Sequence, residues 1–444
     1  MSKNNNGFNK YLHITFLIGF GFFTVGLMEP LYDSYVTIFL KKYIEQTWLI
    51  GLIMALDNVL ALFLIPIISD ISDKTNTKIG RRMPWIIILV PISAIFYSLL
   101  PYAAKTSLTA LIVVIGLLNL SKQSSRGPIV ALMPDMVPAE YRSQGNGVIN
   151  TMGNIAGIAG TILLARLMDL DIVLPILGPT KDTLPFPLVG ILAIFATILL
   201  FFFVKERKSP LYQEQVIKNS STVKFKEKIK TVLKGSITRD GKQDQSTLFI
   251  LVSLFFWFMA YQGLVPYMGV YSIETFDIST GSGAIASGMV AIAGVIFAIP
   301  MGFLASKFGR KKMIRISLFA LVLVFLSQIA VFFLAESSTN PSQYVYLFWG
   351  IFFVFGIFWI CIVANSFPIL WQMASFAKIG LYTGLYYTFS QAAGILSPFF
   401  AGIVIDMVGY EGLFAYGATF FILAFITMGL VQGGEKFDKE ESQQ

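Results

Sequence analysis

Five ionisable side chains lie within long apolar stretches of this sequence, where they can bind or move a charge. Three are acidic and two are basic: Glu29, Asp33, Asp57, Lys122 and Arg126. On insertion scales, an unpaired charge in such a setting costs about 2.5 to 3.5 kcal/mol, so each needs a partner or a function. Their formal charges leave one carboxylate uncompensated. We expect that carboxylate to be protonated, or to bind a cation, when water is excluded.

The spacing of these residues indicates two polar stripes that can face each other. Glu29 and Asp33 are four residues apart and therefore share one face of a helix. The second stripe is formed by Asn119, Lys122, Gln123 and Arg126. A buried acid of this kind can load a proton on one side of a membrane and release it when a Lys or Arg moves close. A purely structural ion-pair network, or a position for Asp33 in outer water, would be the alternative.

Composition predicts that the elements holding these stripes are membrane helices. Hydrophobic residues make up 55% of the chain and charged residues 13%, and the mean hydropathy is +0.71. Many apolar runs reach 18 residues, enough to cross roughly 30 Å of hydrocarbon. We therefore expect an all-α membrane protein of about 12 transmembrane helices, at 12–40, 47–69, 85–103, 107–133, 145–168, 186–204, 247–272, 282–304, 314–335, 344–366, 380–405 and 411–432.

Internal repetition divides these helices into two six-helix halves. Pro30 in the first predicted helix is matched by Pro266 in the seventh. A longer pattern has identical spacing in both halves: Gly147, Asn150, Asn154 and Gly157 match Gly384, Tyr387, Gln391 and Gly394. We predict halves at 1–204 and 246–444, joined by a Lys-rich cytoplasmic linker at 205–245. Parallel halves are typical of a major facilitator, which rocks them about a midplane site.

The charge and composition of the chain also limit which partners are expected. The net charge is +8, and most Lys and Arg fall in the segments that become cytoplasmic if the amino terminus is inside. The positive-inside rule then predicts a multi-pass protein of the plasma (inner) membrane with both termini in the cytoplasm. Anionic lipid, and not nucleic acid, is the expected partner of this charge. With one Cys and one His, no metal site, cofactor or enzymatic chemistry is expected.

Two segments carry a family resemblance. Residues 73–85, from Asp73 to Trp85, resemble the loop between helices 2 and 3 of the glycoside, pentoside and hexuronide cation symporters and of the related sucrose and maltose proton symporters. Residues 126–142 are similar to the end of helix 4 and the following loop in the sucrose and maltose type. The resemblance implies a major facilitator fold and cation-coupled transport of a sugar or glycoside. In the melibiose-like branch, two helix-2 acids help to bind sodium. Ala61 and Ile65 stand in those places here, so a proton is the more strongly expected coupling ion.

The matched loops predict a cytoplasmic gate. Gly80 permits a tight turn, Arg81 and Arg82 can hold helix-end carbonyls, and Asp73 can accept from them. The alternative is that these charges only set topology. The complete set of predicted gate residues is Asp73, Gly80, Arg81, Arg82, Arg142, Gly309, Arg310 and Lys311.

The second half lacks counterpart charges, since Val265 and Gly269 stand at the repeat positions of Glu29 and Asp33. We expect it to supply neutral hydrogen bonds and aromatic faces for a hydroxyl-rich substrate. The predicted substrate-binding residues are Asn119, Gln123, Asn150, Asn154, Tyr261, Gln262, Trp359, Asn365, Tyr387 and Gln391. An exporter or carrier of amphipathic compounds or lipids is the alternative function, with a non-transporting sensor or a membrane enzyme more remote. We expect the protein to be a monomer.

Overall fold

Apolar runs of the sequence form long helices throughout the computed structural model, which describes residues 5–138, 141–175, 178–208, 236–237, 243–244, 246–372 and 379–432. Within these ranges, twelve helical segments are long and apolar enough to cross a bilayer. The expected all-α architecture with twelve spans is therefore confirmed. The predicted Lys cluster of the linker, at 224–234, lies outside the described residues.

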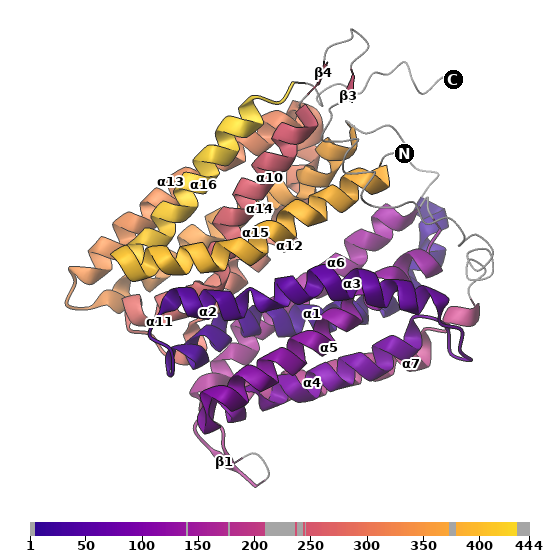
Figure 1. Ribbon diagram of the computed structural model, residues 1–444, viewed down its shortest axis with the longest axis horizontal. Coiled ribbons are helices and arrows are strands. Elements are labelled where there is room, and N and C mark those ends of the chain that lie inside the picture. The colour runs from indigo at the N-terminus through magenta and orange to yellow at the C-terminus, as the bar shows by residue number, and fades with distance from the viewer. Residues whose placement is uncertain are drawn as a thin grey trace. The chain divides into compact units, whose positions relative to one another are not determined.

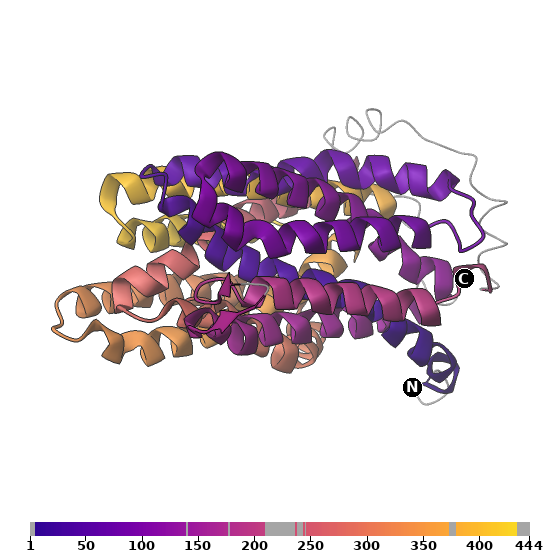
Figure 2. The ribbon, with the colours of Figure 1, turned by 90° about the horizontal axis from the view of Figure 1, so that it is seen from below.

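The first six spans are formed by nine helical elements, with a short hairpin before the last of them. They are α1 (Asn5–Lys41), α2 (Thr47–Met54), α3 (Leu56–Lys74), α4 (Met83–Thr106), α5 (Leu108–Met136), α6 (Arg142–Ile158) with its π-helical extension Ala159–Leu164 and a 3₁₀ turn Ala165–Asp169, and α7 (Pro185–Phe203). Strands β1 (Val173–Leu174) and β2 (Gly178–Pro179) pair antiparallel between α6 and α7. Figure 2 shows these indigo to magenta helices running alongside one another.

The second six spans follow the same plan. They are α10 (Ser246–Leu264) continued by α11 (Met268–Phe276), α12 (Ile285–Phe308), α13 (Arg310–Glu336), α14 (Val345–Gln372), α15 (Ile379–Val408) and α16 (Glu411–Gly429). A short antiparallel pair, β3 (Ser236–Ile237) with β4 (Gln243–Asp244), precedes them. Pro266 lies in a 3₁₀ turn, Val265–Tyr267, that separates α10 from α11, whereas α1 continues through Pro30.

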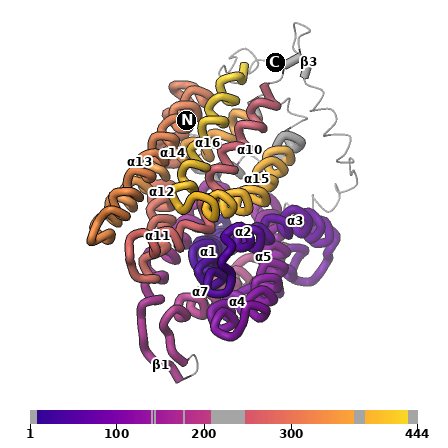
Figure 3. Tube along the Cα trace, turned by 60° about the vertical axis from the view of Figure 1, so that its left-hand side comes forward, coloured from indigo at the N-terminus to yellow at the C-terminus, as the bar shows by residue number. Residues whose placement is uncertain are grey.

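By its contacts the chain divides into two compact units. The first is Met1–Ser221 with Val265–Ala291, and the second is Thr222–Leu264 with Ile292–Gln444. The first unit therefore includes α11 and the start of α12 beside the first six spans (Figures 1 and 3). In its core, the rings of Tyr35, Phe39 and Tyr97 all contact Phe186 of α7.

Two helix boundaries correct the sequence prediction at the gate. Helix α3 continues to Lys74, so Asp73 lies in its last turn and not in a loop. Helix α13 begins at Arg310, so Arg310 and Lys311 form its first turn. A single residue, Gly309, joins α12 to α13 at a φ of 95°. That positive φ, which glycine tolerates, lets the chain turn without a longer loop.

Candidate functional site

Helices α1, α3 and α5 bring the five intramembrane charges together in the first unit. Arg126 Nη1 lies 2.8 Å from Glu29 Oε1, within hydrogen-bond distance. Lys122 Nζ lies 3.7 Å from Asp57 Oδ2, which is an ion pair without a hydrogen bond. The two polar stripes expected from the sequence thus lie against each other. Each base is paired with a different acid.

Asp33 is the carboxylate left over from this pairing. It lies half-buried on α1, close enough to Asp57, Lys122, Glu29 and Arg126 to interact with their charges. Within the part of the chain that the structure describes, however, no hydrogen bond or ion pair joins Asp33 to another side chain. The uncompensated negative charge predicted from the sequence is therefore assigned to one residue.

A neutral ring also contacts the Lys122 ammonium, and uncharged polar groups lie on the same helix. Its Nζ lies 4.7 Å from the centre of the Tyr32 ring, a cation–π distance. Asn119 Nδ2 donates to Tyr32 Oη at 2.9 Å. Asn119 Oδ1, Gln123 Oε1 and Lys122 Nζ are all buried without a hydrogen-bond partner among the described residues. Three buried polar atoms on one helix therefore remain able to bind a polar group.

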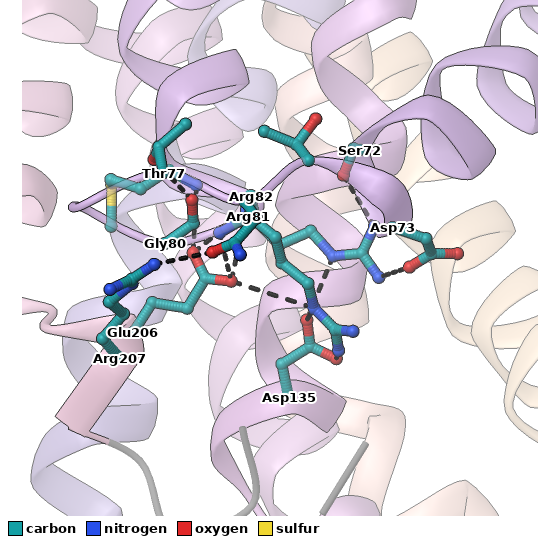
Figure 4. Close-up of polar contacts among 12 residues, drawn as sticks. Ser72, Asp73, Thr77, Gly80, Arg81, Arg82, Asp135, Glu206 and Arg207 are labelled. Carbon is teal, nitrogen blue, oxygen red and sulfur yellow. Dashed lines mark hydrogen bonds and ion pairs between the residues drawn. The ribbon is translucent and has the colours of Figure 1, made fainter. Parts of the chain in front are cut away.

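A second cluster of charged residues is buried where the end of α3, the start of α4 and the end of α5 meet (Figure 4). Arg81 Nη2 and Arg82 Nε lie 2.7 and 3.0 Å from the two oxygens of Asp135. Arg82 also donates to Asp73 and to Ser72 Oγ. Asp135 therefore joins two adjacent guanidinium groups. The Arg81, Arg82 and Asp135 side chains are at most 5% exposed.

Glu206 completes this cluster from the residues just after α7. Its carboxylate accepts hydrogen bonds from the backbone N–H groups of Arg81, Arg82 and Met83 at 3.0, 3.0 and 3.1 Å. Those N–H groups lie at the start of α4 and have no partner within the helix. The carboxylate therefore caps the helix, and its negative charge interacts favourably with the positive end of the helix dipole. We call Asp73, Arg81, Arg82, Asp135 and Glu206 the latch cluster.

Burial and charge act against each other in the latch cluster. Burial raises the pKa of the Glu206 carboxyl, and the hydrogen bonds from the three backbone N–H groups oppose that rise. For Arg81, burial alone lowers the pKa, but the hydrogen bond and negative charge of Asp135 outweigh it and raise the pKa. The guanidinium of Arg81 is therefore held in its charged form.

Sequence reasoning missed Asp135 and Glu206 as members of the cluster. Asp135 stood in the segment that carried the family resemblance, but the sequence did not indicate that it contacts Arg81 and Arg82. Glu206 stood in a charged stretch interpreted as linker. An acid placed directly after a span, among Lys205, Arg207 and Lys208, is the one available signal. The Arg142 side chain lies outside the described part of the structure.

The corresponding turn of the second half, between α12 and α13, is held by different contacts. Gly80 and Gly309 both have positive φ, at 128° and 95°, so the repeated turn is present in both halves. Lys311 Nζ donates to the Val431 carbonyl at 2.5 Å, just beyond the end of α16. A cation here holds the end of a neighbouring helix, where carbonyls lack partners.

Comparison with known proteins settles the family. Residues 14–398 match the family model described as Major Facilitator Superfamily. The chain belongs to the major facilitator superfamily. It is a membrane transporter and not an enzyme, and the expected fold is confirmed. Members of this superfamily alternate access to a small-molecule site within the membrane.

Solved structures of other major facilitators share this fold. A bacterial homologue of the human lysosomal transporter Spinster, inward-facing and occupied, has a TM-score of 0.67 at 14% identity, covering 97% of this chain and 96% of its own. A mutant of the nucleoside transporter NupG has a TM-score of 0.69 at 16% identity, with coverages of 95% and 99%. An inward-facing bacterial homologue of the iron transporter ferroportin gives 0.65 at 14%, covering 94% and 98%. No curated protein matched the sequence.

In this major facilitator, the second-half substrate candidates divide into packed and accessible residues. Tyr261 stacks on Trp359 with ring centres 4.2 Å apart, and Trp359 is buried. Asn365 is buried and donates to the Cys361 carbonyl of its own helix. Gln262 is half-buried, Tyr387 is exposed, and Gln391 Oε1 is buried without a hydrogen-bond partner in the described ranges.

The first-half amides on α6 differ from their predicted setting. Asn150 is exposed and its amide donates to the Asn146 carbonyl one turn earlier. Asn154, one turn later, is also exposed. Among the described residues, neither amide forms the hydrogen bond with another helix that a midspan amide was expected to need. Their part in substrate binding stays a prediction.

Proposed function

We propose that this major facilitator is a proton-coupled symporter of a sugar or glycoside. Proton coupling is supported by one observation. Three carboxylates and two bases meet in the first unit, and Asp33 is the carboxylate without an ion pair among the described residues. A lone acid in a largely apolar setting is stabilised by taking up a proton. Protonation neutralises the cluster, so the proton can accompany the substrate through the cycle.

The neighbouring bases supply a means of release. Lys122 lies 3.7 Å from Asp57 with no hydrogen bond, so its ammonium has no hydrogen bond to break before it moves toward Asp33. A cation that moves toward a protonated acid favours loss of the proton. Arg126 is bound more closely to Glu29, at 2.8 Å. We therefore assign the exchange of partners to Lys122, and a fixed positive charge to Arg126.

The sugar part of the proposal is supported by the resemblance of residues 73–85 and 126–142 to sugar symporters, and by the polar atoms near Lys122. Asn119 and Gln123 present buried amide groups that hydroxyl groups can satisfy. The excess of Lys and Arg in alternate loops supports cytoplasmic termini in a plasma (inner) membrane. In that orientation, the latch cluster faces the cytoplasm.

Uptake into proteoliposomes tests this function. The purified protein is reconstituted and given labelled disaccharides under an imposed pH gradient, then under a sodium gradient, with a labelled nucleoside for comparison. We expect accumulation of a disaccharide with the pH gradient alone. Accumulation driven only by sodium would contradict proton coupling. Accumulation of the nucleoside but of no glycoside would contradict the sugar assignment. No accumulation under either gradient would favour an exporter or lipid carrier.

A further inference from the structure

The first unit contains a stretch from the second half of the sequence, Val265–Ala291. Within it α11 packs against α1 (Figure 3), and a 3₁₀ turn at Thr280–Ser282 leads to α12. These contacts lie near the end of α1 that carries Lys41, which we call the distal end. For alternating access, the distal end must open in one state and close in the other.

Asp169 makes the most specific contact with this stretch. Its Oδ2 accepts a hydrogen bond from Ser279 Oγ at 2.7 Å, and its Oδ1 accepts from the Gly281 backbone N–H at 2.9 Å. One carboxylate therefore binds both sides of the turn before α12. Asp169 itself ends the fifth span, Gly145–Asp169, so the contact joins a first-half helix to a second-half turn.

The space around Gly281 shows how closely the turn fits this carboxylate. A Cβ atom added at Gly281 would lie 2.4 Å from Asp169 Oδ2 and 3.0 Å from the Ala165 carbonyl oxygen. Contacts below 3.0 Å do not occur between real atoms of this kind, so a larger residue would displace the carboxylate. The position of the Asp169 carboxylate therefore requires a glycine at 281.

Two further contacts hold the same stretch. Tyr35 Oη donates to the Thr280 carbonyl at 2.9 Å, and Tyr35 is fully buried. Lys41 Nζ lies 2.6 Å from Glu274, but both side chains are at least a third exposed, so this ion pair contributes little. Asp169 is exposed as well, but its carboxylate accepts two hydrogen bonds, one of them from a backbone N–H, so it positions the turn more specifically than the lysine pair does.

We propose that Asp169 is a positioning residue of the transport cycle, which latches the 279–281 turn and so sets how readily the distal end opens. It acts through Ser279 and Gly281 and does not touch the substrate. The inference rests on the superfamily's alternating access and holds for any substrate. Its test therefore stays separate from the test of sugar and proton transport.

Cysteine labelling of the purified protein in nanodiscs measures the opening. The native Cys361 is replaced by Ser, and Ala284→Cys, at a fully buried position beside the turn, reports on the distal end. Ala94→Cys, also fully buried in the same unit, reports on general loosening of the fold. A hydrophilic maleimide is added and the rate of labelling at each cysteine is recorded.

Asp169→Ala should raise the labelling rate at position 284 about tenfold, the change expected from losing charge-assisted hydrogen bonds, and leave position 94 unchanged. Asp169→Asn keeps an oxygen that can accept from Ser279, so it should give a smaller increase. Gly281→Ala should behave like Asp169→Ala. The matched control is Asp171→Ala, which removes an exposed acid that has no hydrogen bond or ion pair in the described structure.

Three results would overturn the proposal. One is a labelling rate at position 284 that is the same in Asp169→Ala and Asp171→Ala. Another is an equal rise at positions 284 and 94, because that would mean Asp169 only stabilises the fold. Rapid labelling of position 284 in the otherwise unchanged protein would also contradict it, since the distal end would then not be held closed.

Discussion

Glu206 and Arg81 are 125 residues apart in sequence, yet the Glu206 carboxylate accepts a hydrogen bond from the Arg81 backbone N–H at 3.0 Å. The same carboxylate accepts from the next two N–H groups and thereby caps α4. It also lies 3.9 Å from the Arg81 guanidinium. The start of α4 is therefore held by the segment that leaves α7, and the latch cluster depends on both.

Removing this cap should destabilise the protein. Glu206→Ala leaves three buried N–H groups without an acceptor, for an expected loss of about 1.5 to 3 kcal/mol. The measurement is the apparent Tm of the purified protein in detergent. Glu336→Ala is the control, because Glu336 is exposed at the end of α13 and makes no hydrogen bond or ion pair among the described residues. Equal Tm values for the two variants would refute the capping role.

Two of the three acids in the latch cluster, Asp135 and Asp73, should contribute differently to stability. Asp135 is buried and bridges two guanidinium groups, whereas the Asp73 side chain is 38% exposed. Breaking a buried pair costs about 3 to 5 kcal/mol, and an exposed one about 1 kcal/mol or less. Asp135→Ala should therefore lower the Tm or the folded yield far more than Asp73→Ala. A larger effect from Asp73→Ala would show that the buried bridge is not what holds the cluster.

That the intramembrane charges lie together could be predicted from the sequence because the cost of burying charge is a local property. Five ionisable residues stand out because they lie in apolar runs, and the sum of their formal charges already required one acid without a basic partner. Which acid it is depends on helix rotation, and only the structure assigns it to Asp33. Glu206 was missed for the same reason, since nothing nearby in sequence indicates that it reaches α4.

Helix ends and breaks were harder to predict than helix positions. Pro30 and Pro266 occupy matching places, but α1 continues through the first and a 3₁₀ turn forms at the second. A proline removes one hydrogen bond in either case, and neighbouring helices decide whether the helix can continue. The basic residues at 310–312 were expected in a loop because charge usually marks a boundary, yet they form the first turn of α13.

The pair of Lys122 and Asp57 gives a test by double mutation. Asp57→Asn leaves the Lys122 ammonium buried without its 3.7 Å partner, and Lys122→Met leaves Asp57 uncompensated. Each single variant should lower the Tm, and the double variant should recover most of the loss because no buried charge is left unpaired. Purely additive losses in the double variant would mean that the two residues do not stabilise each other.

Gly269 explains why the second half has no acid opposite Asp33. A Cβ atom at Gly269 would lie 2.2 Å from the Ser34 carbonyl oxygen of α1, so any side chain there separates α11 from α1. Gly269→Ala should raise maleimide labelling at the distal reporter, Ala284→Cys, by about tenfold or more, as expected for a steric clash of over 1 kcal/mol. Gly116→Ala is the control, because among the described residues its added Cβ would have nothing within 4 Å beyond its own stretch of helix. The same rate in both variants would contradict this account of the α1–α11 contact.

The central claim, that Asp33 carries the coupling proton, is tested most directly by one substitution in proteoliposomes. Asp33→Asn is permanently neutral and resembles the protonated acid, so it should preserve exchange of labelled sugar across the membrane while abolishing accumulation driven by a pH gradient. Glu29→Gln serves as comparison, because Glu29 is paired with Arg126 at 2.8 Å and its loss should disturb exchange as well. Accumulation by Asp33→Asn at the level of the unmodified protein would contradict the account.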